Sequence, residues 1–138
     1  MTAHRFLSEP WVAELDRLLT HQRFSGATKG YVVGIECTND AGLPTDHVHL
    51  VFDEERVRAV YGEPRRADAS IIVDRALAEA LWTEQDPTFG AMVYNAGMIR
   101  SRGDLGALLH LQQLLVAGTK QALVAAMEPF TAQRSPTT

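Results

Sequence analysis

Three polar side chains that suit metal binding lie on two neighbouring segments: Glu36 on the first, His47 and His49 on the second. Both segments alternate apolar and polar residues, which predicts β-strands whose alternate side chains share a face. If the connecting loop pairs Thr38 with His47, Glu36 lies opposite His49, and a His-x-His pair with a carboxylate can bind a divalent cation. The alternative, a polar face of a sheet turned to solvent, is favoured, because no third His or Cys follows at ligand spacing.

The other candidates for chemistry have simpler interpretations. Asp74, Glu79 and Glu84 suit helix caps and solvated helix faces, and no Ser, Cys or His is fixed beside them by spacing. Cys37 alternates in line with apolar residues, which indicates a buried and unreactive thiol. We therefore expect no catalytic residue, no metal and no cofactor, so the chain is not expected to be an enzyme.

Length and composition favour one domain. The chain has 138 residues, a formal net charge of −4 and a single cysteine, and its mean hydropathy is −0.10. We expect one domain over residues 1–130 and a disordered polar tail over residues 131–138. The acidic balance disfavours nucleic acid and anionic membrane as partners, the lack of a long apolar run predicts no membrane span, and a cytoplasmic location is expected.

Five segments have the pattern of strands. The first three are joined by short turns and predict an antiparallel meander with one apolar face, so the helices should pack on that face in an α+β fold. The expected sheet is mainly antiparallel and five-stranded, with strands Tyr31 to Asn39, His47 to Asp53, Arg56 to Tyr61, Ala69 to Val73 and Met98 to Arg102.

The helical segments share apolar residues at a spacing of three and four. They are Ser8 to Gln22, Arg75 to Trp82, a helix that starts at Asp86 and Pro87, Asp104 to Val116, and Lys120 to Met127. In the segment from Asp104, the leucines and Val116 cover an arc of roughly 220°, where packing on one surface needs about 100°. This helix should therefore be covered from two sides, and Gln112 within the arc should meet a polar partner.

The second half of the chain resembles the sterol carrier protein type 2 family, as a standalone bacterial member. The resemblance covers about half of the chain and rests on an ordered set of residues rather than one motif: Asp86 and Pro87, Ala91, Gly97, Gly103 and Asp104, Leu108, Leu111 and Gln112, and Leu114. It implies a five-stranded sheet with helices packed on one face. A hydrophobic tunnel lies between the two layers in that family and takes up sterols, fatty acyl chains or acyl-CoA.

The resemblance also implies a function and a site. The function is non-catalytic binding or transfer of a hydrophobic small molecule, with affinity from burial of its apolar surface. The alternative is an interaction or dimerisation module that acts as an accessory domain to an enzyme, with a possible homodimer. The residues that the resemblance places along the tunnel are Phe89, Met92, Leu108, Leu111, Gln112 and Leu115.

Overall fold

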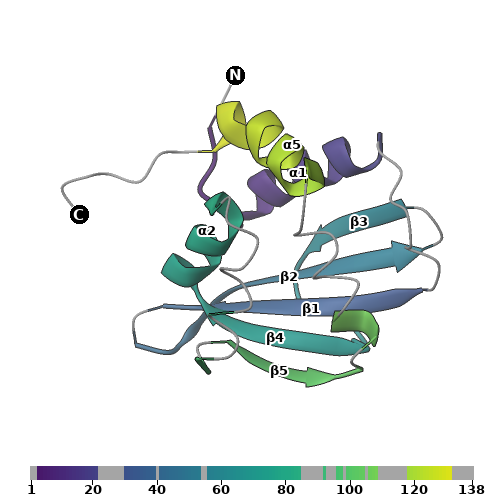
Figure 1. Ribbon diagram of the computed structural model, residues 1–138, viewed down its shortest axis with the longest axis vertical. Helices are drawn as coiled ribbons and strands as arrows, with labels where there is room; N and C mark the ends of the chain where they lie inside the picture. The colour runs from purple at the N-terminus through teal and green to yellow at the C-terminus, as the bar shows by residue number, and fades with distance from the viewer. Residues whose placement is uncertain are drawn as a thin grey trace.

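A sheet and a layer of helices make up the described part of the chain. The computed structural model describes residues 3–21, 30–39, 41–53, 56–84, 92, 96–97, 99–104, 106–108 and 118–131, and for residues 118–120 the backbone only. The elements, labelled as in Figure 1, are α1 (Glu9–Leu19), β1 (Tyr31–Thr38), β2 (Pro44–Asp53), β3 (Arg56–Tyr61), β4 (Ala69–Asp74), α2 (Arg75–Thr83), β5 (Arg100–Gly103), α5 (Gly118–Met127) and the 3₁₀ helix η1 (Glu128–Phe130).

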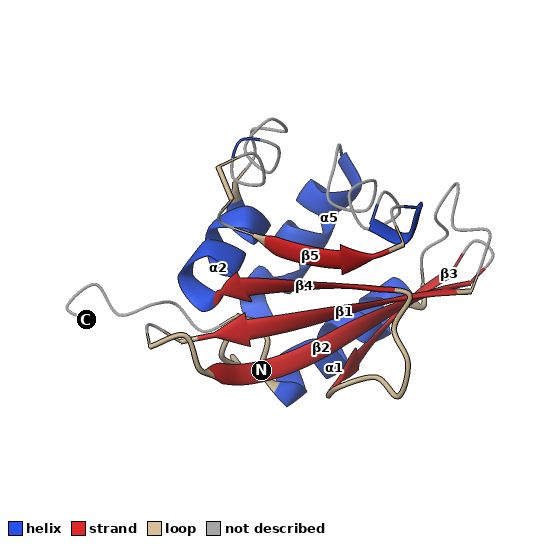
Figure 2. Ribbon diagram, turned by 90° about the horizontal axis from the view of Figure 1, so that it is seen from below, coloured by secondary structure: helices blue, strands red, loops and turns tan. Residues whose placement is uncertain are grey.

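The five strands form one sheet in the order β3-β2-β1-β4-β5. Three of its four strand pairs are antiparallel, as the sequence predicts, and one parallel pair makes the sheet mixed. β1 runs antiparallel to β2 but parallel to β4, as the arrows in Figure 2 show. The reason is the connection over residues 62–68, which leads from β3 at one edge to the far side of β1. The chain therefore re-enters the sheet in the direction of β1 rather than extending the meander.

The helices α1, α2 and α5 lie on the same side of the sheet (Figure 1). α1 presents one apolar stripe, and Trp11, Val12, Leu15 and Leu19 are buried along it. Opposite them, alternate strand residues face the helices, and Val33 and Val57 are fully buried. The predicted arrangement of helices on one face of a five-stranded sheet is therefore confirmed, and the core fills the space between the two layers.

One edge of the sheet is covered by α1. Asp16 accepts a hydrogen bond from the backbone N–H of Ala59 at 2.9 Å and two from the Arg58 guanidinium at 2.8 Å each. An edge strand otherwise presents unpaired N–H groups that can pair with another chain. Asp16 thus fixes α1 against β3 and satisfies part of that edge.

The hairpin between β1 and β2 closes earlier than the sequence predicts. Asn39 organises a short loop in which its side chain accepts hydrogen bonds from the N–H groups of Ala41 and Leu43. β2 therefore begins at Pro44, and the register shifts between Cys37 and Thr38. Thr38 therefore pairs with Pro44 and not with His47, the pairing on which the metal hypothesis depends.

Parts of the expected architecture lie outside the described residues. These are most of the helix expected after Pro87, most of the helix expected over Asp104 to Val116, and residues 132–138 of the expected tail. Of these segments, Met92 and residues 106–108 are helical. Within the described residues, no helix is long and apolar enough to cross a membrane.

Candidate ligand-binding site

An apolar cavity of about 110 Å³ lies between the sheet and the helices. Every described element except β3, β5 and η1 contributes to its wall, and so does the segment before α1. The lining residues are all apolar or aromatic: Phe6, Leu7, Trp11, Leu15, Leu19, Ile35, Val48, Leu50, Ile71, Val73, Ala78, Leu81, Trp82 and Leu123. Because the described wall offers almost no polar group, the cavity suits the apolar part of a molecule and not a charged one.

Paired residues of neighbouring strands form one wall of the cavity. Ile35 of β1 lies opposite Val48 of β2 on one side and Ile71 of β4 on the other. These three β-branched side chains form a continuous row on the inward face, because residues paired across strands point to the same side of a sheet. The sheet therefore provides a firm apolar surface on which a ligand can lie.

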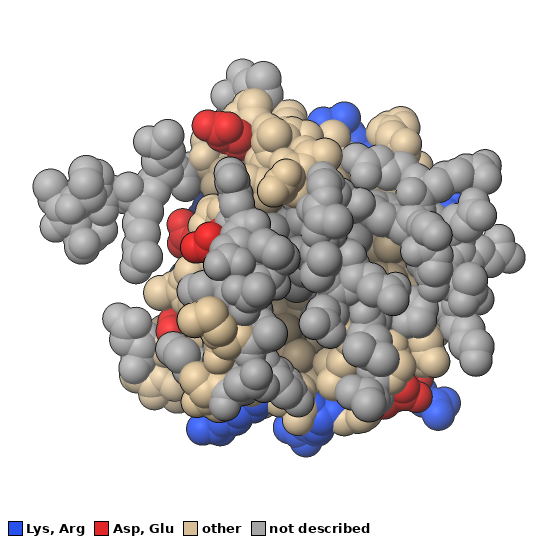
Figure 3. Space-filling model, in the orientation of Figure 1, with Lys and Arg blue, Asp and Glu red and all other residues tan. Residues whose placement is uncertain are grey.

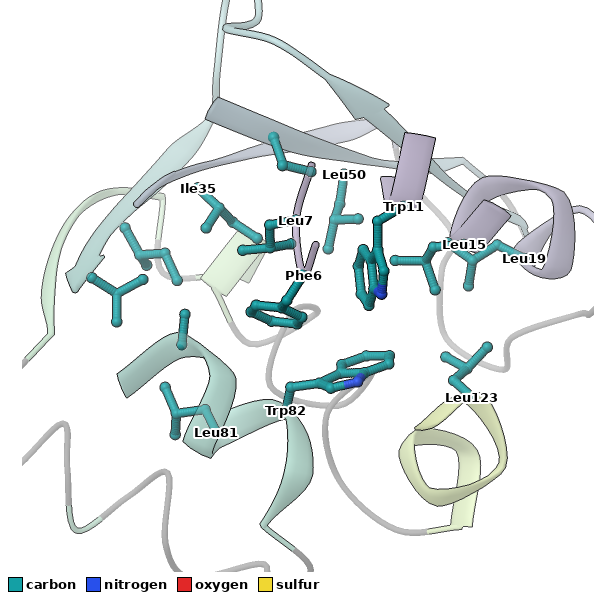
Figure 4. Close-up of a pocket in the computed structure, with 14 residues that line it drawn as sticks. Phe6, Leu7, Trp11, Leu15, Leu19, Ile35, Leu50, Leu81, Trp82 and Leu123 are labelled. Carbon is teal, nitrogen blue, oxygen red and sulfur yellow. The ribbon is translucent and has the colours of Figure 1, made fainter. Parts of the chain in front are cut away.

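Three aromatic rings from three segments meet in the opposite wall. The Phe6 and Trp11 ring centroids are 4.9 Å apart at 69°, and those of Trp11 and Trp82 are 5.4 Å apart at 78°. Such edge-to-face pairs add about 0.5–1.5 kcal/mol beyond the burial of their area. Figure 4 shows the rings of Phe6 and Trp82 facing one another between α2 and the segment before α1. The aromatic cluster thus connects α1, α2 and the residues just before α1 around the cavity.

Residues 4–8, which we call the N-terminal segment, form the part of the wall without regular secondary structure. Phe6 and Leu7 are 6% and 8% exposed, and Leu7 has a positive φ of 62°. At its start, the N–H of His4 donates to the carbonyl of Phe130 at 2.7 Å, and His4 forms an isolated parallel bridge with Thr131. The segment is therefore held across the end of the helical layer.

A buried charge cluster lies beside the N-terminal segment. The side chain of Asp46 in β2 is 1% exposed and forms ion pairs with Arg5 and Arg75. The hydroxyl of Tyr61 donates to Asp46 Oδ1 at 2.6 Å. The Arg75 guanidinium also donates from Nη1 to the carbonyl of Phe6 at 2.8 Å. The cluster thus connects β2, the start of α2 and the backbone of the N-terminal segment.

Two groups in this region have shifted pKa values. Burial, followed by the positive charge of Arg5, lowers the pKa of Arg75 below its ordinary value. Burial also raises the pKa of the Cys37 thiol to about 11. Cys37 is 1% exposed, so the expectation of a buried thiol is confirmed, and an uncharged, enclosed sulfur is a poor nucleophile.

The residues predicted to line a tunnel are only partly within the described chain. Phe89, Leu111, Gln112 and Leu115 lie outside the described residues. Met92 is described and is 62% exposed. Leu108 is half-buried and packs against the hydrophobic core, but neither residue is among those that line the cavity.

The polar strand residues do not converge as the metal hypothesis requires. Glu36 pairs with His47, with Oε1 and Nε2 2.9 Å apart. His49 instead lies opposite Gly34, and its Nδ1 is 2.9 Å from the carbonyl oxygen of Gly62. Among the described residues no group of three His, Cys, Asp or Glu side chains could hold a metal ion. The earlier closure of the hairpin is what separates Glu36 from His49.

The cavity residues contributed by the first half of the chain were not identified from sequence. The signals were present: the apolar stripe of the first helix, which contains Trp11, and the inward alternation of the strands, which contains Ile35 and Leu50. Both patterns also describe an ordinary core, so periodicity alone does not tell a cavity wall from close packing.

Comparison with solved structures identifies the fold. The chain has the sterol carrier protein 2 fold, and the similar solved structures are sterol carrier protein 2 or sterol-carrier-like proteins. A crystal structure of sterol carrier protein 2 matches at a TM-score of 0.60 and 19% identity over 92% of this chain and 100% of that chain. The recognition of this fold from the second half of the sequence is therefore confirmed.

Two further structures illustrate the range of similar proteins. The ubiquinone synthesis protein UbiJ-SCP2 matches at a TM-score of 0.52 and 19% identity over 88% of this chain and 93% of that chain. A palmitated sterol-carrier-like protein from Aedes aegypti matches at a TM-score of 0.58 and 14% identity, over 81% of this chain and 96% of that chain. Comparisons with protein-family models and with curated protein sequences give no match.

The face of the molecule seen in Figure 3, with the helices above the sheet, shows the described charged side chains mainly near its outline. In Figure 3 the described acidic side chains lie mainly towards the left and upper left of this face, and the basic ones mainly along its lower edge. The described wall of the cavity itself contains no charged side chain that would bind the polar end of a ligand inside it.

Proposed function

We propose that this protein binds a hydrophobic small molecule, of the lipid, fatty acyl or sterol-like kind, between its sheet and its helices, and carries it without chemical change. The observation that carries the proposal is the cavity itself, to whose wall the described residues contribute fourteen apolar and aromatic side chains. The fold supports the same function, because the similar structures include sterol carrier proteins and one that is palmitated.

The size of the cavity limits what fits without movement. A cavity of roughly 150 Å³ lined by aliphatic and aromatic side chains accepts one benzene molecule. At about 110 Å³, this cavity holds a few methylene groups or one small ring. An acyl chain or a sterol therefore requires that part of the wall moves outward when the ligand enters.

The affinity would come from removal of apolar surface from water. At about 25 cal/mol per Å², burial of roughly 200 Å² of ligand surface contributes about 5 kcal/mol before the costs of association. The described wall adds almost no polar contact, so binding should increase with chain length. A polar head group would remain at the surface of the protein.

The proposal is tested by titration with a dansyl-labelled undecanoic acid, excited through Trp11 and Trp82, which both line the cavity. Ala78→Leu places a larger side chain into the cavity and should weaken binding at least tenfold. Ala80→Leu is the matched control, because Ala80 lies on the same helix, is half-buried and does not line the cavity. Equal affinity of the two variants would place the ligand elsewhere, and no binding by the wild type would remove the function.

The alternative function, an interaction or dimerisation module, predicts a different result in solution. A stable dimer that takes up no hydrophobic ligand would favour it. The dimer would be measured by analytical ultracentrifugation of the protein used for the titration. A monomer that binds the probe with a stoichiometry of one favours the carrier.

A further inference from the structure

The N-terminal segment differs from every other part of the cavity wall. All other lining residues belong to α1, α2, α5 or a strand, whose backbones are held by repeated hydrogen bonds. Phe6 and Leu7 instead belong to a short stretch outside any helix or strand (Figure 4). A wall that has to move for a long ligand can move here without breaking a helix or a sheet.

Within the described part of the chain, few bonds hold this segment to the other elements. They are the ion pair of Arg5 with Asp46, the hydrogen bond from Arg75 to the carbonyl of Phe6, and the hydrogen bond from His4 to the carbonyl of Phe130. The Arg5 side chain is 58% exposed, so water can replace its contacts at small cost. The packing of Phe6 and Leu7 supplies the remaining stabilisation.

The charge cluster is arranged so that it survives the loss of the segment. Removing one partner of a buried ion pair is costly when it leaves an uncompensated charge. Asp46, however, keeps its ion pair with Arg75 and its hydrogen bond from Tyr61, both of which belong to the body of the protein. Release of the segment therefore removes the exposed Arg5 partner and the Phe6 carbonyl that accepts from Arg75, but leaves no unpaired buried carboxylate.

The local backbone conformation favours release. Leu7 is the only non-glycine residue with a positive φ within the described chain, and a bulky side chain in that region is strained. The adjacent Ser8 hydroxyl is buried and has no hydrogen-bond partner among the described residues. Movement of the segment about Ser8 relieves the strain at Leu7 and exposes the Ser8 hydroxyl to water. The three bonds named above and the packing of Phe6 and Leu7 oppose this movement.

We propose that residues 4–8 form a movable wall of the cavity, hinged near Ser8 and fastened by Arg5 and the Phe6 carbonyl to the fixed group Asp46, Arg75 and Tyr61. This inference rests on the proposed function, since it names the part of the wall through which the ligand enters and leaves. Opening of residues 4–8 controls the rates of ligand uptake and release more than it controls the affinity.

A cross-link tests the movement directly. His4 and Thr131 are bridge partners, and adjacent strands lie about 4.8 Å apart, within the range that a disulfide spans. In the variant His4→Cys/Thr131→Cys, oxidation should slow both association and dissociation of the dansyl-undecanoate probe at least tenfold, and reduction should restore them. The reduced form of the same variant is the baseline, since Thr131 also accepts a hydrogen bond from Trp11. Cys37 does not interfere, because its thiol is buried.

A matched pair of substitutions tests the role of the ion pair between Arg5 and Asp46. Arg5→Gln should raise both rates about tenfold, the factor expected on loss of one charge-assisted contact. Arg66→Gln removes the same charge from an arginine that is also exposed but lies in the connection over residues 62–68, and should leave both rates unchanged. Equal rates for the oxidised and reduced cross-link variant, or for Arg5→Gln and Arg66→Gln, would overturn the proposal.

Hydrogen exchange measures the opening without a ligand. The amides of residues 4–8 should exchange at least a hundredfold faster than those of β1 in the free protein, and oxidation of the cross-link variant should slow them. Exchange of both segments at the same rate would mean that the segment opens only with global unfolding, which overturns the proposal. If the probe does not bind at all, the proposed function fails, and this measurement still decides whether the segment moves.

Discussion

Arg75, the first residue of α2, forms an ion pair with Asp46, a β2 carboxylate whose side chain is only 1% exposed. Asp46 and Arg75 come from distant parts of the chain, and their pairing fixes the start of α2 against the end of the sheet. The same helix then carries Ala78, Leu81 and Trp82 into the cavity wall. The position of one wall of the cavity therefore depends on a charge that is not itself part of that wall.

Asp46→Asn should lower the free energy of unfolding by about 3–5 kcal/mol, because it leaves Arg75 half-buried without its counter-charge. Urea denaturation followed by tryptophan fluorescence measures the change. The control is Glu14→Gln, which breaks an exposed i,i+3 pair with Arg17 and should cost less than about 1 kcal/mol. Similar values for the two variants would mean that the buried pair does not stabilise α2.

Asp16→Asn should destabilise the protein by about 1 kcal/mol at pH 7. The hydrogen bonds from Arg58 lower the pKa of Asp16 below its ordinary value of 3.8. A lowered pKa stabilises the fold above pH 3.8, and this contribution is lost as the pH falls through the lower folded value. The difference between wild type and variant should therefore shrink at pH 3. A difference that stays constant from pH 7 to pH 3 would contradict this account.

Cys37 should make the fold sensitive to alkali. Its pKa is raised from 9.0 to about 11, so the folded state keeps a proton that the unfolded state loses between these values. Stability should fall across this pH window by at most about 1.4 kcal/mol per unit. Denaturation curves at pH 8, 9 and 10 should converge for wild type and Cys37→Ala. Parallel curves would show that Cys37 ionises equally in both states.

Gly103→Ala should cost at least about 2 kcal/mol. Gly103 ends β5 with a φ of +102°, and a Cβ there would collide with the carbonyl oxygen of Asp68 and with Ala69. Gly30→Ala is the control, since a Cβ at Gly30 meets nothing within 4 Å, and should change stability by less than about 0.5 kcal/mol. Thermal unfolding of both variants measures the difference, and equal melting temperatures would argue against a tight approach of β5 to β4.

The strands and the exposed faces follow from local patterns. Alternation from Tyr31 identifies β1 and its inward side, and Asp74 identifies the start of α2, where its carboxylate accepts a hydrogen bond from the N–H of Ala76 at 2.9 Å. These features depend on residues that are close in sequence. The parallel pairing of β1 with β4 does not, because it depends on the path of the connection over residues 62–68.

The candidate site was also harder to predict, because its residues come from segments that are far apart in sequence. Phe6, Trp11 and Trp82 meet only when three segments pack together, and no local pattern distinguishes a ring that lines a cavity from one that fills a core. The partners of Asp46 are equally distant in sequence, and Asp46 itself reads as a loop residue beside Thr45. The remaining predicted site residues, Phe89, Leu111, Gln112 and Leu115, stay predictions.

The central claim, that a hydrophobic molecule occupies the interlayer cavity, is tested most directly by native mass spectrometry of wild type and Ala78→Leu after incubation with fatty acids and sterols. The account predicts an adduct of one ligand per wild-type chain, retained at low collision energy and strongly reduced in Ala78→Leu but not in Ala80→Leu. A wild-type spectrum that shows only the mass of the bare chain with every ligand would contradict it.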